Sequence, residues 1–328
     1  MAMPHAAILG IGAYAPSRVM TNAELEQKVD TSNEWIIERT GIEERHIAAP
    51  DEAASDLALK AARDAMAMAG VTPQDLDLIV CATVTGDTPF PSTACWLQSK
   101  LGAPQAAAFD IAAGCTGFLY GIHVVQNLIR SGAYKKVLLV GVEVLSRVLD
   151  WTDRSTCVLL GDAAGAAILG AAVDESGILA SNIAADGDKG ELLHLPAGGS
   201  RHPASHETVD GRLHYFKMNG RETFKHATRN MGEIAQKTLR DAGLGLGDVD
   251  LLVPHQANLR IITYLAKALD VPMEKVFTNV QRYGNTSSAS IPLALTEAYK
   301  AGRVQKGQVI LMVAFGAGLT WGATALRW

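Results

Sequence analysis

Residues 106–132 read AAAFDIAAGCTGFLYGIHVVQNLIRSG, and they place one cysteine, Cys115, between two apolar segments. Residues 106–113 are short, mostly apolar and free of turn signals, which predicts a β-strand covered on both faces. Residues 118–129 are apolar on nearly all sides and Gly132 supplies a stop signal, so a buried helix is predicted. Cys115 therefore lies at a predicted helix N-terminus, where unpaired N–H groups and the helix dipole favour the nucleophilic thiolate.

Two interpretations of Cys115 follow from these residues alone. Its small neighbours, Ala112, Ala113, Gly114 and Gly117, leave room for a substrate to approach the sulfur. A free cysteine in an apolar setting is, however, usually an inert residue that packs as a small hydrophobe. The local sequence leaves both interpretations open.

Composition restricts the class of protein. The chain has 328 residues with 29 basic and 34 acidic side chains, so its charge predicts neither nucleic acid nor a membrane surface as a partner. The cysteines, at positions 81, 95, 115 and 157, are too widely spaced for paired C-x-x-C zinc ligands and too few for a disulfide scaffold. There is no basic signal-peptide segment, and no apolar run reaches the ~18 residues that a membrane helix needs. We expect a soluble cytoplasmic protein without a bound metal.

An internal repeat predicts the domain organisation. Residues 64–80 align without gaps on residues 237–253 at an offset of 173, and each copy reads as a helix, a turn and a buried strand. At an offset of 170, Cys115 falls on Asn285 and Gly132 falls on Gly302. The chain is therefore predicted to be an α/β protein of two similar halves, residues 1–173 and 174–328, with a site between them.

The second half holds a segment without a counterpart in the first, at about residues 181–218. It contains four histidines, a residue type that binds metals, but neither a cysteine nor a helical period supports a metal site. A mobile insertion loop is the expected structure. The histidines are His194, His202, His206 and His214.

Three further candidates lie where predicted strands end. His255 follows the buried strand 251–253, at the end of the strand where α/β sheets bind ligands, although a lone histidine there is more often a packed core residue. Asn285 lies at a predicted helix start, where it would serve equally as an ordinary N-cap. The glycine-rich turn 315–318 can turn its N–H groups toward an anion, or can be a plain turn. Cys115, His255 and Asn285 can converge on one pocket.

Five motifs together resemble the β-ketoacyl-acyl-carrier-protein synthase III family over practically the whole chain. They are TSNEWIIERTGI at 31–42, DIAAGCTGF at 110–118, PHQAN at 254–258, YGNTS at 283–287 and FGAGLTWG at 315–322. The resemblance implies a duplicated thiolase-like fold, with two pseudo-symmetric halves in a layered αβαβα arrangement, and it accounts for the repeat.

The resemblance also implies roles for the strand-end residues. Cys115 corresponds to the acyl-accepting nucleophile, and His255 and Asn285 correspond to its two partners. The backbone N–H groups of Cys115 and Ala317 would form the oxyanion hole. The family usually has glycine at the position of Ala317, but a backbone role tolerates the change.

Binding residues are implied in the same way. Thr31, Trp35, Arg39, Arg154 and Asn258 match coenzyme A positions, with Trp35 and Arg154 on either side of the adenine and Asn258 along the pantetheine tunnel. Phe90 matches a residue that reaches the acyl pocket of a neighbouring subunit, which implies a homodimer.

Docking of an acidic carrier protein would need a local basic surface. Lys225 lies with Arg221 and Arg229 at helical spacing, and Arg260 and Lys267 follow the histidine motif. Such a stripe is normally a solvated helix face. Lys225 and Arg260 also match carrier-binding positions of the family, so we favour docking by Lys225, Arg260 and Lys267.

The implied reaction is a decarboxylative Claisen condensation. A short acyl group, acetyl by the bulk of Phe90, passes from acyl-CoA to Cys115 and then to malonyl-acyl-carrier-protein, giving a 3-oxoacyl-acyl-carrier-protein, CoA and CO2 and initiating fatty acid synthesis. No metal or redox cofactor is required.

Three other classes were weighed against this one. The alternative within the fold is a starter-unit condensing enzyme or acyltransferase of secondary metabolism. A papain-like hydrolase also uses Cys, His and Asn, but the chain lacks its CGSCW signature. A non-catalytic partner subunit should lack the nucleophile.

Overall fold

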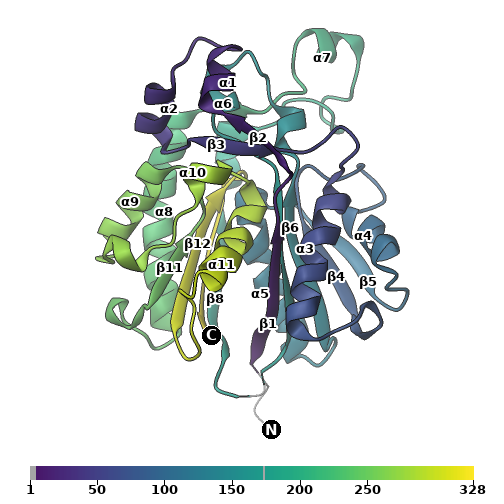
Figure 1. The fold of residues 1–328 in the computed structure, drawn as a ribbon, viewed down its shortest axis with the longest axis vertical. Coiled ribbons are helices and arrows are strands. Elements are labelled where there is room, and N and C mark those ends of the chain that lie inside the picture. The colour runs from purple at the N-terminus through teal and green to yellow at the C-terminus, as the bar shows by residue number, and fades with distance from the viewer. Residues whose placement is uncertain (1–4, 173) are drawn as a thin grey trace.

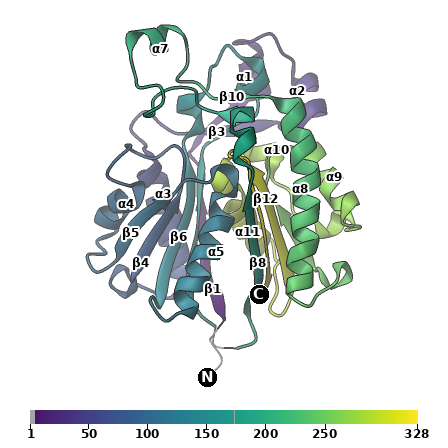
Figure 2. The same cartoon turned by 180° about the vertical axis from the view of Figure 1, so that it is seen from behind.

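Two β-sheets organise the chain, for which the computed structural model describes residues 5–172 and 174–328 (Figures 1 and 2). The first sheet has five strands, in the order β1 (Ala6–Tyr14), β7 (Ala163–Ala171), β6 (Lys136–Glu143), β4 (Leu78–Ala82) and β5 (Ala107–Ile111). The second has four, in the order β8 (Gly177–Ala185), β13 (Thr320–Arg327), β12 (Val309–Gly316) and β11 (Leu251–Pro254).

Helices cover both sheets and fill the space between them. The helices between the sheets are α5 (Gly117–Arg130) and α11 (Ser290–Lys300), whose apolar residues share one core with strands of both sheets. Helices α3 (Ala54–Ala69) and α4 (Thr93–Leu101) pack on the outer face of the first sheet, and α8 (Gly220–Asp241) and α9 (Leu259–Ala268) pack on the outer face of the second. This five-layer αβαβα arrangement confirms the predicted thiolase-like fold (Figure 1).

The internal repeat is visible in the order and pairing of the strands. Parallel β4 and β6 followed by antiparallel β7 match parallel β11 and β12 followed by antiparallel β13. The short helices before β4 and β11, η1 (Pro73–Asp75) and η5 (Leu246–Asp248), keep the offset of 173. In the first half, β5 pairs in parallel with β4. At the corresponding position of the second half there is only a single parallel bridge, between Leu252 and Val276.

The structure corrects two expectations about the segments around this repeat. Strand β5 is not covered on both faces: it is the edge strand, and Phe109 is 37% exposed. The predicted insertion at 181–218 begins too early, because residues 181–185 belong to β8 and pair with β13. The proposed division at residues 173 and 174 stays a prediction, since Val173 lies outside the described residues.

Short elements from both halves gather at the upper end of the molecule in Figure 1. Several of them line the cavity described below, so they form its walls and its opening. From the first half come β2 (Arg18–Thr21), α1 (Asn22–Glu26), α2 (Asn33–Thr40), β3 (Glu44–Ile47), η3 (Leu145–Val148) and α6 (Arg154–Cys157). From the second half come η4 (Gly187–Leu192), β9 (Leu193–His194), α7 (His206–Asp210), β10 (Lys217–Met218) and α10 (Val280–Tyr283), whereas η6 (Met273–Lys275) lies near the start of β11, away from the cavity.

Candidate active site

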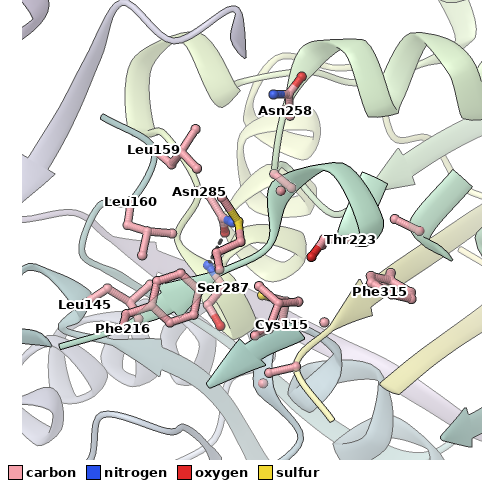
Figure 3. A pocket seen from close by; sticks show the side chains of 18 of the residues that line it. Cys115, Leu145, Leu159, Leu160, Phe216, Thr223, Asn258, Asn285, Ser287 and Phe315 are labelled. Atoms are coloured by element: carbon pink, nitrogen blue, oxygen red, sulfur yellow. Dashed lines mark hydrogen bonds between the residues drawn. The ribbon is translucent and has the colours of Figure 1, made fainter. Parts of the chain in front are cut away.

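Cys115, His255 and Asn285 line one cavity of about 440 Å³, which has lining residues from both halves. Figure 3 shows Cys115 and Asn285 in the cavity wall. Cys115 lies in the short helix η2 (Gly114–Thr116), which joins β5 to α5. His255 directly follows β11, and Asn285 precedes the short helix η7 (Ser287–Ala289), which leads into α11. In each half, a strand followed by a turn and a helix thus places a reactive side chain at the cavity: the thiol from the first half and the imidazole from the second.

Asn285 is not the symmetry mate of Cys115, as the offset of 170 suggested. The helix pairs η2 and η7, and α5 and α11, both begin 173 residues apart, which places Ser288 opposite Cys115. Helix α11 is three residues shorter than α5, so the glycines at the helix ends align at an offset of 170 while the helix starts do not. Asn285 therefore approaches the cavity from the turn before η7.

Burial, rather than the helix dipole, dominates the protonation of Cys115. The pKa of the Cys115 thiol is raised to about 11, mainly by burial and to a smaller extent by the nearby Glu143 carboxylate. A hydrogen bond from Ser287 and the backbone N–H groups of Cys115 and Ala317 act in the opposite direction. The sequence-based expectation of a favoured thiolate was therefore wrong for the free site, because it left out the cost of removing a charge from water.

The surroundings of His255 select one tautomer of its imidazole. Its Nδ1 atom lies 2.6 Å from the hydroxyl of Ser290, which also accepts a bond from the N–H group of Gln256. Burial lowers the pKa of His255 to about 3, so the ring is neutral at physiological pH. Among the described residues, no other acceptor lies within hydrogen-bond distance of the Ser290 hydroxyl, so we assign its proton to the bond with Nδ1. This assignment places the ring proton on Nε2 and makes the ring a hydrogen-bond donor at that atom.

The amide of Asn285 is oriented by the backbone. Its Oδ1 atom accepts a hydrogen bond of 2.8 Å from the N–H group of Ser287, which leaves the Nδ2 donors available to the cavity (Figure 3). The main chain of Asn285 is itself fixed by bonds to Leu159 and Gly161. The cavity thus contains two neutral donors, an imidazole N–H and an amide NH2, whose orientations are set by other groups.

Close packing brings two backbone N–H groups to the sulfur. A Cβ atom on Gly316 would lie 2.6 Å from the Cys115 nitrogen, and one on Gly114 would lie 3.0 Å from the Ala317 nitrogen. Only glycines permit this approach of the 114–116 and 316–318 segments. The hydroxyl of Thr320, 3.0 Å from the Ala113 oxygen and 2.9 Å from the Ala317 oxygen, links the two segments. The arrangement can stabilise an oxyanion formed next to Sγ.

Four of the five residues assigned to coenzyme A lie around the cavity opening. Trp35, Arg39 and Asn258 line the cavity itself, and the Arg154 guanidinium lies 5.3 Å from the centre of the Trp35 ring. Asn258 caps α9 and donates from Nδ2 to the Arg39 carbonyl oxygen. Arg154 covers the ring directly, so a flat base can enter between them only if Arg154 swings outward, since two stacking contacts need about 7 Å. The fifth residue, Thr31, is not in the cavity wall, and its buried hydroxyl has no partner in the described part of the chain.

Phe90 does not line the cavity of its own chain. It is 86% exposed and is not among the residues that line the cavity. The expected role of Phe90 at the acyl pocket of a neighbouring subunit stays a prediction.

The three residues assigned to the carrier protein lie on the adjacent outer surface. Lys225, Arg260 and Lys267 are exposed, on α8 and α9. Arg260 and Lys267 line a groove together with apolar side chains that include Phe224 and Tyr264. Arg260 also lies over the Phe224 ring, which lines both this groove and the cavity, so the groove adjoins the cavity opening.

Sequence reasoning missed the residues that support the three candidates. Ser287 and Ser290 lie in the run NTSSAS at 285–290, whose serine content was the only available signal. Glu143 ends β6 and had no motif. No group of three or more His, Cys, Asp or Glu side chains in the described residues is arranged to hold a metal, and no described helix is long and apolar enough to cross a membrane.

Comparison with known proteins identifies the relatives of this chain. A family model described as 3-Oxoacyl-[acyl-carrier-protein (ACP)] synthase III matches residues 109–187, and a model of its C-terminal part matches residues 239–328. The chain is 57% identical to beta-ketoacyl-[acyl-carrier-protein] synthase III of Symbiobacterium thermophilum over 98% of this chain and 97% of the relative. It superposes on the crystal structure of 3-oxoacyl-[acyl-carrier-protein] synthase III from Aquifex aeolicus with a TM-score of 0.92 and 49% identity, covering 98% of this chain and 100% of the other.

A relative from a different pathway has the same fold. The priming beta-ketosynthase from the R1128 polyketide biosynthetic pathway is 36% identical, with a TM-score of 0.92 and coverage of 99% of this chain and 96% of the other. The arrangement of the cavity, the two matching models and the identity along nearly the whole chain agree. This chain belongs to the β-ketoacyl-acyl-carrier-protein synthase III family.

Proposed function

We propose that this protein condenses an acyl group, carried from acyl-CoA on Cys115, with malonyl-acyl-carrier-protein, and so initiates fatty acid synthesis. In the first half-reaction the sulfur of Cys115 attacks the thioester, and the N–H groups of Cys115 and Ala317 stabilise the resulting oxyanion. CoA then leaves. No metal or redox cofactor takes part in either half-reaction.

In the second half-reaction the malonyl group loses CO2 and negative charge moves onto its thioester oxygen. His255 Nε2–H and Asn285 Nδ2–H stabilise this charge, and the carbanion attacks the acyl group on Cys115. The observation that carries the proposal is the fixed donor orientation: Ser290 sets the imidazole tautomer, and the Ser287 N–H sets the amide. Neither donor carries a charge that would need neutralising, so both suit a developing enolate.

The proposal separates the roles of the three residues. His255→Ala and Asn285→Ala should still accept an acetyl group on Cys115, but should release CO2 from malonyl-acyl-carrier-protein at least about 100-fold more slowly. Cys115→Ala should release CO2 without forming a carbon–carbon bond. The measurement is the release of labelled CO2, with protein acylation followed in parallel by mass. Normal CO2 release by both donor variants would contradict the proposal.

Secondary metabolism is the second candidate, favoured by the similarity to the R1128 priming ketosynthase. The two candidates share the chemistry and differ in the acyl group and the carrier protein. Because Phe90 is bulky, we propose acetyl-CoA as the acyl donor. A panel of acyl-CoAs, each followed by malonyl groups on a fatty acid or a polyketide carrier, distinguishes the candidates.

We propose that acyl-CoA reaches Cys115 from the surface along one wall of the cavity. Trp35, Arg39 and Asn258 share a wall with Cys115, which supports a path for coenzyme A from the surface to the thiol, with Arg154 and Thr31 at its outer end. The groove with Arg260 and Lys267, with Lys225 near it, offers positive charge next to the opening for an acidic carrier protein.

A homodimer is proposed from the exposed face around β5. This edge strand leaves backbone groups unpaired on its outer side, and Phe109 on it is an exposed apolar side chain. Val84, Phe90 and Trp96, in the segment from the end of β4 into α4, are also exposed. A second copy would cover this face and receive Phe90. Phe109→Asp should convert the dimer to a monomer in sedimentation velocity, whereas a monomeric parent protein would contradict the proposal.

A cytoplasmic location is proposed from the cysteines. Cys81, Cys95, Cys115 and Cys157 are free thiols, which a reducing compartment preserves.

A further inference from the structure

Gln256 is a buried amide next to His255, and the reaction described above gives it no role. Its Nε2 atom donates to the carbonyl oxygens of Pro254, at 2.8 Å, and Phe277, at 3.1 Å. Its Oε1 atom accepts a bond of 2.9 Å from the N–H group of Asn279. A flipped amide would turn its oxygen toward two carbonyl oxygens, so these partners fix the orientation of the group. The side chain thus joins the end of β11 to the segment that leads to α10.

The Gln256 amide replaces a backbone bond that Pro254 cannot make. The chain after β11 begins to pair with this strand in parallel: Leu252 forms a bridge with Val276, and its carbonyl oxygen accepts from the N–H group of Phe277. In a regular parallel ladder, the next donor, to the Phe277 carbonyl oxygen, would be the N–H group of residue 254, which proline lacks. Gln256 donates to that oxygen instead. The ladder therefore continues through a side chain.

This replacement occurs where the two halves of the protein differ. In the first half, β5 pairs with β4 along its whole length and leads directly to Cys115. In the second half, the corresponding segment pairs through the bridge at Val276 and then turns into α10. Asn279 is the residue before α10, and Asn285 follows this helix after Gly284. Gln256 therefore holds the segment at the residue from which the turn toward the cavity begins.

The turn from Asn279 to Tyr283 behaves as one unit because a single carboxylate ties its two ends together. The Asn279 amide donates to Glu297 Oε2 at 2.8 Å, and the Tyr283 hydroxyl donates to Glu297 Oε1 at 2.7 Å. The Asn279 carbonyl oxygen also accepts from the N–H group of Tyr283, at 3.3 Å. The Gln256 side chain anchors this unit to β11, and so a shift at Asn279 moves the chain that carries Asn285 into the cavity wall (Figure 3).

We infer that Gln256 is a positioning residue that sets the place of the Asn285 amide relative to the His255 imidazole, which deepens the proposed function and rests on it. His255 is held independently, by the bond of 2.8 Å from its N–H group to the Val313 oxygen and by the Ser290 hydroxyl. Both donors must reach the same developing enolate oxygen, so their separation decides how well the charge is stabilised. A misplacement of about 1 Å can slow a reaction about 100-fold.

The first test compares the two half-reactions in Gln256→Met, which removes all three side-chain bonds but keeps a similar length. Acetylation of Cys115 from acetyl-CoA should stay within about twofold of the parent rate, because it uses backbone N–H groups of other segments. For release of labelled CO2 from malonyl-acyl-carrier-protein, kcat should fall at least about ten-fold while KM stays within about threefold.

Gln126→Met is the matched control. Gln126 is also a buried amide, on α5, and its side chain makes no hydrogen bond to residues 276–285 in the described part of the chain. It should keep both rates within about twofold of the parent protein. Equal slowing of CO2 release in both Gln→Met variants would mean that any buried change has this effect, and would overturn the positioning role.

The second test is a double-mutant cycle with Asn285, which a merely structural role would not satisfy. Because Gln256 acts through the position of the Asn285 amide, Gln256→Met should slow CO2 release by less than about twofold in the Asn285→Ala background. A further ten-fold loss in that background, or normal release by Gln256→Met alone, would overturn the positioning role. Gln256→Asn, which is one methylene shorter and cannot reach both segments, should show the same pattern and replaces Gln256→Met if that variant does not fold.

The cycle also separates this role from the proposed function. Slow CO2 release by Asn285→Ala together with normal release by Gln256→Met would leave the proposed condensation standing. Normal release by Asn285→Ala would instead count against the proposed function, and Gln256 would then have no donor to position.

Discussion

Ser290→Ala tests whether the tautomer of His255 controls the second half-reaction. The Ser290 hydroxyl lies 2.6 Å from Nδ1 of His255, and both side chains are buried. Without this donor, the tautomer with the proton on Nε2 leaves Nδ1 unpaired, and the other tautomer turns a lone pair toward the enolate. Leaving a buried acceptor unpaired costs about 1–3 kcal/mol, which corresponds to a condensation rate about 5- to 150-fold lower.

The assay separates the two half-reactions in a rapid-quench experiment. Acetylation of Cys115 from acetyl-CoA should stay within about twofold of the parent rate in Ser290→Ala, because this step uses backbone N–H groups. Condensation with malonyl-acyl-carrier-protein should slow as calculated. Thr296→Val, which removes another buried hydroxyl from α11, is the control, since Thr296 bonds only to the Pro292 carbonyl oxygen among the described residues. Equal slowing of both steps in Ser290→Ala, or of neither, would refute the reasoning.

Three further substitutions test other parts of the account. In Gly316→Ala the new Cβ would lie 2.6 Å from the Cys115 nitrogen, so acetylation should fall by about 100-fold or more, whereas Gly187→Ala, with open space around it, should keep the parent rate. Gly232→Ala, inside α8 with no atom near the new methyl group, should raise the free energy of unfolding in urea by about 0.5–1 kcal/mol. Arg260→Glu should raise KM for malonyl-acyl-carrier-protein about ten-fold or more, with little change in acetylation from acetyl-CoA; equal effects on both would exclude a docking role.

Much of the fold and the positions of the three central residues could be predicted because the relevant signals are local. Each half repeats a helix, a turn and a buried strand. His255 follows the repeated strand of the second half, and Cys115 follows β5 of the first half. Cys115 and His255 follow strands in the sequence, so the strand-end rule for α/β sheets made them candidates, and the five family motifs selected them. The glycine-rich turn 315–318 likewise indicated N–H groups that can face an anion, and the structure adds its close approach to Cys115.

The remaining features depend on contacts that a sequence does not display. Glu143 meets Ser287 from 144 residues away, and neither residue stands out in composition or spacing. The edge position of β5 follows from the order of strands in the sheet, which the apolar character of residues 106–113 could not reveal. The high pKa of Cys115 arises from burial by many groups of both halves, whereas the helix start that favours a thiolate is a local feature.

The most direct test of the account is the mass of the protein through one reaction cycle. After acetyl-CoA is added, the account predicts one acetyl group on the protein, located by peptide mapping on Cys115. Addition of malonyl-acyl-carrier-protein should remove this group and yield 3-oxobutyryl-acyl-carrier-protein in equal amount, with no adduct at any stage in Cys115→Ala. An acetyl group on another residue, or one that persists on Cys115 without forming the condensed product, would contradict the central claim.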